Sequence, residues 1–547
     1  MSLKPMPIPP VPQDTARVAQ AIYPDGNIYM KMRDKLGSIF QDEDFADLYP
    51  DAGQPTLAPW RLALVTIMQF VEKLSDRQAA EAVRDKISWK YALSLELEDR
   101  GFNFSVLSEF RDRLVNGNAM HRLLDIMVKR LRELGLIKVR GRQRTDATRV
   151  LAQVRVMRRI EMVGETLRAA LNAVAAVEPE WLKSLVSEDW FERYSHRVED
   201  ARLPTSTQER QELAETYGRD GYHLLEAIFD PKSPAWLREI PMIQILHTVW
   251  LHQFVIMDGL VKWRDVKDTP AAQMRYSSPY EIDAHYGSKR QVDWIGYRLH
   301  LTETCDPDLP QLVVNVETTS ASPPDHIATM QVHHSLAKND VLPAEHLMDG
   351  GYVTAEYLAA CDTQYDVDII GPVHPNTNWQ AREKTGYDSS QFHIDWEQEQ
   401  VTCPQGKISY KWHQNVDNYG QPVMRAHFSK RDCRPCSTRH LCTKAKIMGR
   451  IITMRLPEQH KALLRARARQ ETEEYKVIYR KRAGVEGTIS QAVRRLDLRH
   501  CRYRGADKAY LQHTVTAAAV NILRLDDWFN GIKPAQTRVS HFARLAS

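Results

Sequence analysis

Three acidic residues that lie far apart in the sequence each stand in a local pattern that would direct them into one site. Asp146 precedes a run of aliphatic and β-branched residues, which predicts a strand that begins at or beside it. Asp349 follows an apolar stretch and precedes two glycines, as expected of a carboxylate at the C-terminal end of a sheet strand. Together with Glu486, these residues would form a set of converging carboxylates, which suits divalent metal ions and phosphoryl transfer.

Glu486 follows Tyr479 and Arg482 at helical spacing, so the three side chains would share one face of a helix. The same stripe continues through apolar residues at Ile489, Val493 and Leu496. If this stripe is buried, it presses Glu486 toward the sheet. An unpaired buried charge is costly, so Arg482 or a metal ion must neutralise it.

Each acid also has a structural interpretation. Asp146 and Asp349 are compatible with turn or cap positions, and Glu486 is compatible with an ordinary helical salt bridge to Arg482. Two further acids, Asp283 and Asp293, compete with Asp146 for the first position because both lie near the following predicted strand.

These residues resemble the DDE transposases of bacterial insertion sequences, which have an RNase H-like catalytic core. The third-acid signature of that family is Tyr, two residues, Arg, three residues and Glu, and Tyr479, Arg482 and Glu486 match it. The signature then places Lys seven residues after the Glu, where this sequence has Val493, with Arg494 next.

The resemblance extends beyond this signature. The stretches 277–290 and 294–303 are similar to the family, as is Asp349 with its two glycines and Tyr352. It implies that Asp146, Asp349 and Glu486 bind two Mg²⁺ or Mn²⁺ ions. Water would first free a 3′-hydroxyl at the element's ends, and that hydroxyl would then attack target DNA in the same site.

The resemblance also implies the partners and the location. The partners are the terminal inverted repeats of the element, target DNA, and a second copy of the chain in a homodimer on DNA. The location is the bacterial cytoplasm, and the nucleoid when DNA is bound. Two other functions are open: a DNA nuclease that cuts without strand transfer, and a catalytically silent DNA-binding protein derived from such an enzyme.

The interval between Asp349 and Glu486 is too long for a simple connection, which predicts an insert. It contains Cys403, Cys433, Cys436 and Cys442. Four thiolates make a complete tetrahedral ligand set for structural Zn²⁺, and bound zinc would fold a polar segment with little core of its own. His440 is an alternative ligand in place of Cys442 or Cys403, and unrelated reduced thiols are the other interpretation. Related transposases carry a similar four-cysteine insert.

Several side chains are candidates for contact with DNA phosphates. They are Tyr479, Arg482, Arg494 and Arg495 around the third acid, and Arg111 and Arg113 in the helices that precede Asp146. Contacts of this kind supply salt-dependent affinity without sequence information. For any single Arg or Lys, a solvated basic face is the alternative.

Composition limits the class of protein. The chain has 547 residues, 43% hydrophobic and 26% charged, which excludes a predominantly disordered protein. A net charge of +4 is only mildly basic, so a DNA surface must come from local clustering. Seven cysteines without an N-terminal signal sequence indicate reduced thiols. The most apolar long stretch, 243–261, carries polar residues and predicts a buried helix rather than a membrane span.

The predicted fold class is α/β: an RNase H-like mixed-sheet core with a helical N-terminal domain, a helical insertion and a small zinc-binding insert. Core strands are expected at 297–303, 312–317, 346–348 and 368–370, and a closing helix at 511–525. The predicted parts are an N-terminal arm at 1–59, a helical DNA-end-binding domain at 60–138, the first core strand at 139–154, the helical insertion at 155–263, the RNase H-like core at 264–389, the four-cysteine insert at 390–450, the completion of the core with the Glu486 helix at 451–530, and a C-terminal tail at 531–547.

Overall fold

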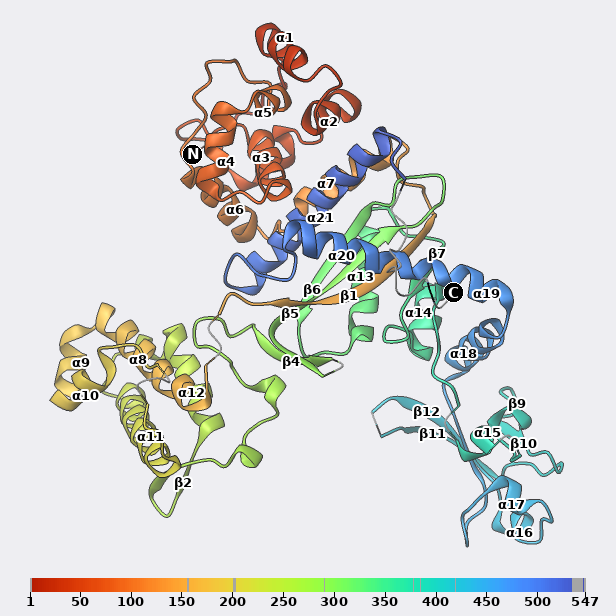
Figure 1. Cartoon of the computed structure of the whole chain (residues 1–547). Helices are drawn as coiled ribbons and strands as arrows, with labels where there is room; N and C mark the ends of the chain where they lie inside the picture. The colour runs from red at the N-terminus through yellow and green to blue at the C-terminus, as the bar shows by residue number, and fades with distance from the viewer. Residues whose placement is uncertain are drawn as a thin grey trace.

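A mixed sheet of six strands lies at the centre of the molecule (Figure 1). The computed structural model describes residues 2–154, 157–199, 203–289, 291–376, 378–383, 385–418, 420–533 and 545. The strands are β1 (Arg142–Leu151), β4 (His285–Lys289), β5 (Val292–Thr304), β6 (Val313–Ser320), β7 (Glu345–Met348) and β8 (Asp368–Ile370). β1 is antiparallel to β5 and parallel to β7, and β7 is parallel to β8. Both β4 and β6 pair antiparallel with β5.

The four predicted core strands correspond to β5, β6, β7 and β8, and the region 139–154 predicted for the first core strand contains β1, but the expectation that this strand begins at or beside Asp146 was wrong. The strand begins at Arg142, so Asp146 lies inside it rather than at its beginning. The physical reason is that polar residues of β1 are buried in pairs: Arg144 is 4% exposed and donates to Glu303, which is 0% exposed. A search for apolar residues therefore misses the first half of the strand.

Helices cover the sheet and complete the core. The helix α20 (Gly484–Leu496) packs on β1 and β5, and α21 (Ala506–Phe529) packs on β6. α13 (Ala328–Lys338) also contacts β6, and α14 (Ala355–Tyr365) contacts β8. The predicted closing helix at 511–525 is confirmed as part of α21, and its alanines are buried because the helix lies between the sheet and the N-terminal helices.

The N-terminal part is a helical domain that packs on α21 (Figure 1). It consists of α1 (Gln13–Ile22), α2 (Ile28–Leu36), α3 (Pro59–Val71), α4 (Asp76–Asp85), α5 (Ile87–Ala92), α6 (Ser105–Asn116) and α7 (Arg122–Glu133). Ser75 and Gln78 form a capping box in which they cap α4 reciprocally. In the segment expected to be an arm, residues 3–12 have no regular structure, but α1 and α2 follow them, and Phe40 and Phe45 are buried in the domain core.

The insertion after β1 is helical and has its own hydrophobic core. It contains α8 (Arg159–Val177), α9 (Pro179–Leu185), α10 (Glu188–Tyr194), α11 (Thr207–Phe229) and α12 (Pro241–Gln253), followed by β2 (Phe254–Met257) and β3 (Leu260–Trp263). The stretch 243–261 is therefore not one helix, because Asp258 and Gly259 adopt positive φ angles of 51° and 74° and turn the chain into a hairpin. Within the described ranges, no helix is both long and apolar enough to cross a membrane.

The segment between β8 and α20 forms a separate small lobe (Figure 1). It contains α15 (Trp379–Glu383), β9 (His393–Asp395), β10 (Gln400–Thr402), β11 (Lys411–Val416), β12 (Pro422–His427), α16 (Lys430–Cys433), α17 (Arg439–Cys442) and β13 (Ile451–Met454). The chain then returns to the sheet through α18 (Pro457–Gln470), α19 (Glu473–Arg480) and the 3₁₀ turn η8 (Lys481–Ala483). Of the expected C-terminal tail, residues 534–544 and 546–547 lie outside the described residues.

A buried polar network joins the N-terminal domain to the core. The hydroxyl of Tyr510 lies 2.6 Å from Nδ1 of His121 in the N-terminal domain and donates to Glu317 of β6 at 3.1 Å. Gln331 donates to the same carboxylate at 3.0 Å. Burial raises the pKa of Glu317 to about 7, and burial also raises the pKa of Asp125, on α7, to about 6. The junction therefore favours protonated carboxyl groups.

We predict that Glu317→Gln flattens the dependence of stability on pH. Because the folded state raises this pKa from 4.5 to about 7, the stabilising contribution is complete below pH 4.5 and is lost as the pH rises through 7. The shift corresponds to roughly 3 kcal/mol. Urea unfolding from pH 5 to pH 8 should show the wild-type protein losing stability more steeply than the variant. Glu180→Gln, at a side chain that is 82% exposed, is the control, and parallel wild-type and Glu317→Gln profiles would contradict the assignment.

Candidate active site

The three predicted acids meet at one guanidinium group. Nη2 of Arg482 lies 2.7 Å from Oδ2 of Asp146 and 3.9 Å from Oδ2 of Asp349. Nη1 of the same residue lies 2.8 Å from Oε1 of Glu486. The acids come from the middle of β1, the end of β7 and the first turn of α20, so three distant segments contribute one carboxylate each.

Asp146 is the most enclosed of the three acids, with a side chain that is 14% exposed. Its Oδ1 accepts a hydrogen bond from the backbone N–H of Ala147 at 2.8 Å. Burial raises its pKa above the ordinary value, and the neighbouring Arg482 acts in the opposite direction. The competing candidates Asp283 and Asp293 are both exposed, and Asp293 is bonded to Ser288 and Tyr286.

Asp349 is held by the turn that follows β7. Its Oδ1 accepts from the backbone N–H of Gly350 at 2.6 Å. The turn packs closely: a Cβ on Gly350 would lie 3.1 Å from the carbonyl oxygen of Pro372. Tyr352 in the same turn is completely buried, and its hydroxyl lies 2.6 Å from Nδ1 of His300 on β5. The aromatic anchor and the small glycine therefore position Asp349 against the sheet.

Glu486 lies in the site but not on the buried stripe of its helix, so that prediction was wrong. Its side chain is 63% exposed. The buried face of α20 instead consists of Val485, Thr488, Ile489, Ala492 and Leu496. This face begins one residue before Glu486, and one residue corresponds to a rotation of about 100°. Glu486 consequently points from the edge of α20 into the site.

Tyr479 and Arg482 precede the helix of Glu486 rather than sharing it. α19 ends at Arg480, a 3₁₀ turn follows, and α20 begins at Gly484. The ring of Tyr479 stacks on Tyr475 with 5.4 Å between centroids. Burial raises the pKa of Tyr479, and the carboxylate of Asp349 acts in the same direction. The signature residues therefore gather around the acids although the helix is interrupted.

A buried carboxylate that the sequence analysis did not identify docks α20 on the sheet. Glu303 of β5 accepts hydrogen bonds from Nε of Arg144 at 2.6 Å, from Oγ1 of Thr488 at 2.5 Å and from Nη1 of Arg524 at 2.7 Å. Arg144 also donates to the carbonyl oxygen of Lys481 at 2.5 Å, just before α20. The available signal was an acid within a predicted core strand, which requires a partner when buried.

The other predicted DNA-contacting residues differ in their surroundings. Arg494 and Arg495 are exposed on α20. Arg113 is partly buried, and its guanidinium lies 4.7 Å from the ring centroid of Tyr49. The prediction for Arg111 was wrong: this residue is 7% exposed and donates through both terminal nitrogens to Asp76. Its charge is neutralised inside the N-terminal domain and does not reach a surface.

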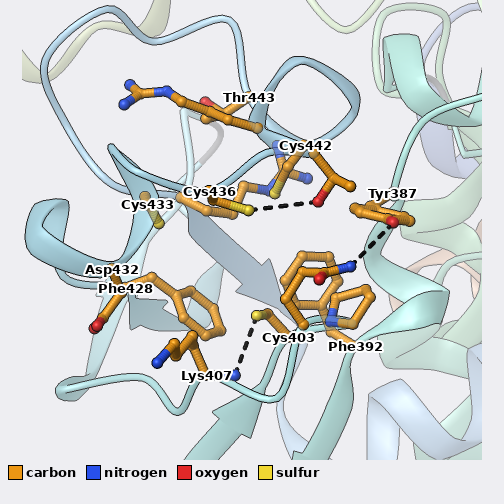
Figure 2. A pocket seen from close by; sticks show the side chains of 15 residues that line it. Tyr387, Phe392, Cys403, Lys407, Phe428, Asp432, Cys433, Cys436, Cys442 and Thr443 are labelled. Carbon is orange, nitrogen blue, oxygen red and sulfur yellow. Dashed lines mark hydrogen bonds between the residues drawn. The ribbon is translucent and has the colours of Figure 1, made fainter.

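The four predicted cysteines line one pocket in the small lobe (Figure 2). The backbone N–H of Lys407 donates to Sγ of Cys403 at 3.4 Å, and Sγ of Cys436 lies 3.4 Å from the hydroxyl of Thr438. Burial raises the pKa of Cys442, and the other three cysteines act in the same direction, whereas Arg450 lowers it. His440, the alternative ligand, is exposed and does not line the pocket.

Two family models match the chain. One is described as a Transposase DDE domain and matches residues 402–526, and the other is described as a Transposase domain (DUF772) and matches residues 17–113. These matches indicate a transposase enzyme. The first match includes Glu486 and all four cysteines, whereas Asp146 and Asp349 lie outside it. No curated protein and no solved structure matches the chain.

The DDE domain implies that the transposase acts on DNA, has an RNase H-like fold and depends on divalent metal. Across the part of the chain that the structure describes, no three or more His, Cys, Asp or Glu side chains are arranged as a formed metal site. The donor chemistry fits nonetheless. The three acids offer the hard oxygen atoms that Mg²⁺ prefers, although Arg482 lies among them. The four thiols that share a pocket offer the ligands of a structural Zn²⁺.

We predict that Gly484→Ala destabilises the transposase. A Cβ on Gly484 would lie only 2.0 Å from Nη1 of Arg144, and this guanidinium cannot move away without leaving Glu303 partly unpaired in the core. The expected loss of unfolding free energy is roughly 2–4 kcal/mol. Gly487→Ala on the same helix is the matched control, because nothing lies within 4 Å of its Cβ, and it should stabilise by about 0.5–1 kcal/mol. Urea unfolding measures both, and equal effects would contradict the close packing at Gly484.

Proposed function

We propose that this transposase cleaves DNA at the ends of an insertion sequence and joins the freed 3′ ends to target DNA. The observation that carries the proposal is the meeting of Asp146, Asp349 and Glu486 at Arg482, in a chain that matches a Transposase DDE domain. A phosphodiester displacement of this kind needs positioned hard ligands and charge stabilisation, without a covalent protein nucleophile.

The three carboxylates would hold two Mg²⁺ or Mn²⁺ ions, which when bound activate the attacking oxygen and stabilise the leaving oxygen of an in-line displacement. The protein's own contribution begins with charge. Three carboxylates at one site repel each other and a phosphodiester, and Arg482 offsets this repulsion through its contacts with Asp146 and Glu486. The same carboxylates raise the pKa of Arg482 against the effect of its burial, so the guanidinium stays charged.

Arg482 and Tyr479 would also position the DNA. The side chain of Arg482 is 13% exposed, and its Nε–H has no hydrogen-bond partner among the described residues. Once released from the acids, the guanidinium would be available to a phosphate, which Arg can bind in bidentate geometry. Tyr479 lies in α19, before the 3₁₀ turn that carries Arg482, and its stacking on Tyr475 fixes the ring. Arg494 and Arg495 extend this basic surface along α20.

The other parts of the chain have supporting roles in this proposal. The N-terminal helices would bind the terminal inverted repeats, and two copies of the chain would pair the two ends. Bound Zn²⁺ would close the four-cysteine lobe. Its apolar core is small, with Phe392 and Phe428 beside the thiols, so metal ligation would supply much of its stability.

We predict that Glu486→Gln lowers DNA cleavage at least about 100-fold while leaving DNA binding within about twofold, because it removes a ligand charge at a largely exposed position. The assay incubates the purified protein with DNA that carries the sequences flanking its own gene, with Mg²⁺ or EDTA. Glu473→Gln, at an exposed side chain of α19, is the matched control.

The products separate the possible functions. Mg²⁺-dependent 3′-hydroxyl ends that are joined to other DNA support transposition, whereas ends that are never joined indicate a nuclease. Specific binding without cleavage would indicate the catalytically silent derivative. Undiminished cleavage by Glu486→Gln would show that the third acid is assigned incorrectly.

We predict that the purified protein contains one zinc ion per chain, bound by Cys403, Cys433, Cys436 and Cys442. Atomic absorption should show that Cys433→Ser and Cys442→Ser lose the metal and unfold at lower temperature. Cys361→Ala, at a buried thiol outside the lobe, should keep it. A folded wild-type protein without zinc would contradict this ligand set.

A further inference from the structure

A groove lies between the N-terminal domain and the helix of Glu486. It has a volume of about 520 Å³. One wall is the turn between α3 and α4, with Lys73, Ser75 and Gln78, and the other is the C-terminal half of α20, with Arg494 and Asp497. The groove is therefore built by two parts of the chain that are far apart in the sequence.

The groove is positively charged. Lys73 and Arg494 are exposed, and Nζ of Lys73 lies 3.3 Å from the backbone oxygen of Arg494, which it uses as an acceptor. Arg502 adds a third cation, fixed by stacking over Phe70 at 4.5 Å. The groove also contains one negative charge, the carboxylate of Asp497, whose Oδ1 lies 2.6 Å from Nδ1 of His500. The net charge of the lining suits an anion.

The position of the groove relative to the acids indicates which anion. Glu486 lies in the first turn of α20 and Arg494 lies about two turns later, a separation of roughly 12 Å along the helix axis. A DNA strand carries one phosphate per 3.4 Å of duplex axis, so this separation corresponds to about three to four base pairs. A duplex whose phosphodiester lies at the acids and whose axis follows α20 would therefore place neighbouring phosphates beside Lys73 and Arg494.

We propose that this groove binds the backbone of the element-end DNA, about three to four base pairs from the cleaved phosphodiester, with Lys73 and Arg494 contacting its phosphates. The inference rests on the proposed function. Element-end DNA is favoured over target DNA because one wall belongs to the N-terminal helices, within the segment that matches a Transposase domain. DNA in the groove would contact that domain and the helix of Glu486 together, which places the sequence-binding part in register with the acids.

The test changes the charge of the groove without changing its backbone. Lys73→Asn suits a residue whose φ is +58°, since Asn tolerates the left-handed region, and Arg494→Gln removes a charge at an exposed helical position. Fluorescence anisotropy in EDTA measures the binding of an element-end duplex by the full chain. Each variant should bind about three- to tenfold more weakly near 0.15 M salt, with the salt slope reduced by about one.

Asp497→Asn supplies a change in the opposite direction. This residue has a φ of +56° at the end of α20, so Asn fits the backbone, and loss of the negative charge should tighten binding about threefold. A purely structural role for the groove would not produce tighter binding. Arg17→Gln, at a side chain that is 72% exposed on α1, is the control for the general loss of one positive charge. Thermal unfolding of each variant checks the fold.

Modified DNA locates the contact. Methylphosphonate at the third and fourth phosphates from the cleavage position should weaken binding by the wild-type protein more than binding by Lys73→Asn, because that variant has already lost one of the two contacts. Equal weakening of both proteins would overturn the position. The same binding assay is repeated with an unrelated target duplex. If Lys73→Asn loses affinity only for the target duplex, the choice of element-end DNA is overturned.

The failures of the two proposals are distinguishable. A wild-type protein that cleaves, together with groove variants that bind like the wild type, would overturn the groove and leave the proposed function intact. The same loss in Arg17→Gln as in Lys73→Asn would also overturn it. A wild-type protein that neither binds nor cleaves element-end DNA would overturn the proposed function, and the groove with it.

Discussion

The geometry of the site depends on one buried carboxylate, that of Glu303. It is completely buried, and an isolated charge in that position would cost several kcal/mol. It is stable there because Arg144 of β1, Thr488 of α20 and Arg524 of α21 all donate to it. The donors come from three different elements, so their bonds fix α20 relative to β1. The relative position of Asp146 and Glu486 follows from this docking.

The two clusters of charged residues in the core differ in their exposure to solvent. Both oxygen atoms of Glu303 accept hydrogen bonds, its side chain is completely buried, and its partners cannot be exchanged without breaking the core. At the site, by contrast, the side chain of Glu486 is 63% exposed and that of Asp349 is 38% exposed, and all three acids share Arg482. Solvent-accessible carboxylates exchange their positive partner at little cost, because water compensates the change. The buried pair provides rigidity, and the open cluster remains available for cations and phosphate.

Much of the fold could be predicted from apolar periodicity, including the later sheet strands and the closing helix in α21. The errors concern charged residues that are buried in pairs. The first half of β1 was missed because Arg144 has the character of a surface residue until its partner on β5 is known. Arg111 was assigned to DNA for the same reason, although Asp76 neutralises it. Neither pair is local in the sequence. The side of α20 on which Glu486 lies was predicted incorrectly because Thr488, a polar residue, lies on the buried side of the helix.

The docking of α20 also explains how a single helix can serve two purposes. Its first turn presents Glu486, and its last turns form one wall of the basic groove against Lys73. A helix is stiff over this length, so whatever holds one end in position also places the other. Misplacement of reacting groups by about 1 Å is enough to cost about 100-fold in rate. A DNA backbone held against the groove wall would therefore be in register with the acids only because Glu303 prevents α20 from sliding on the sheet.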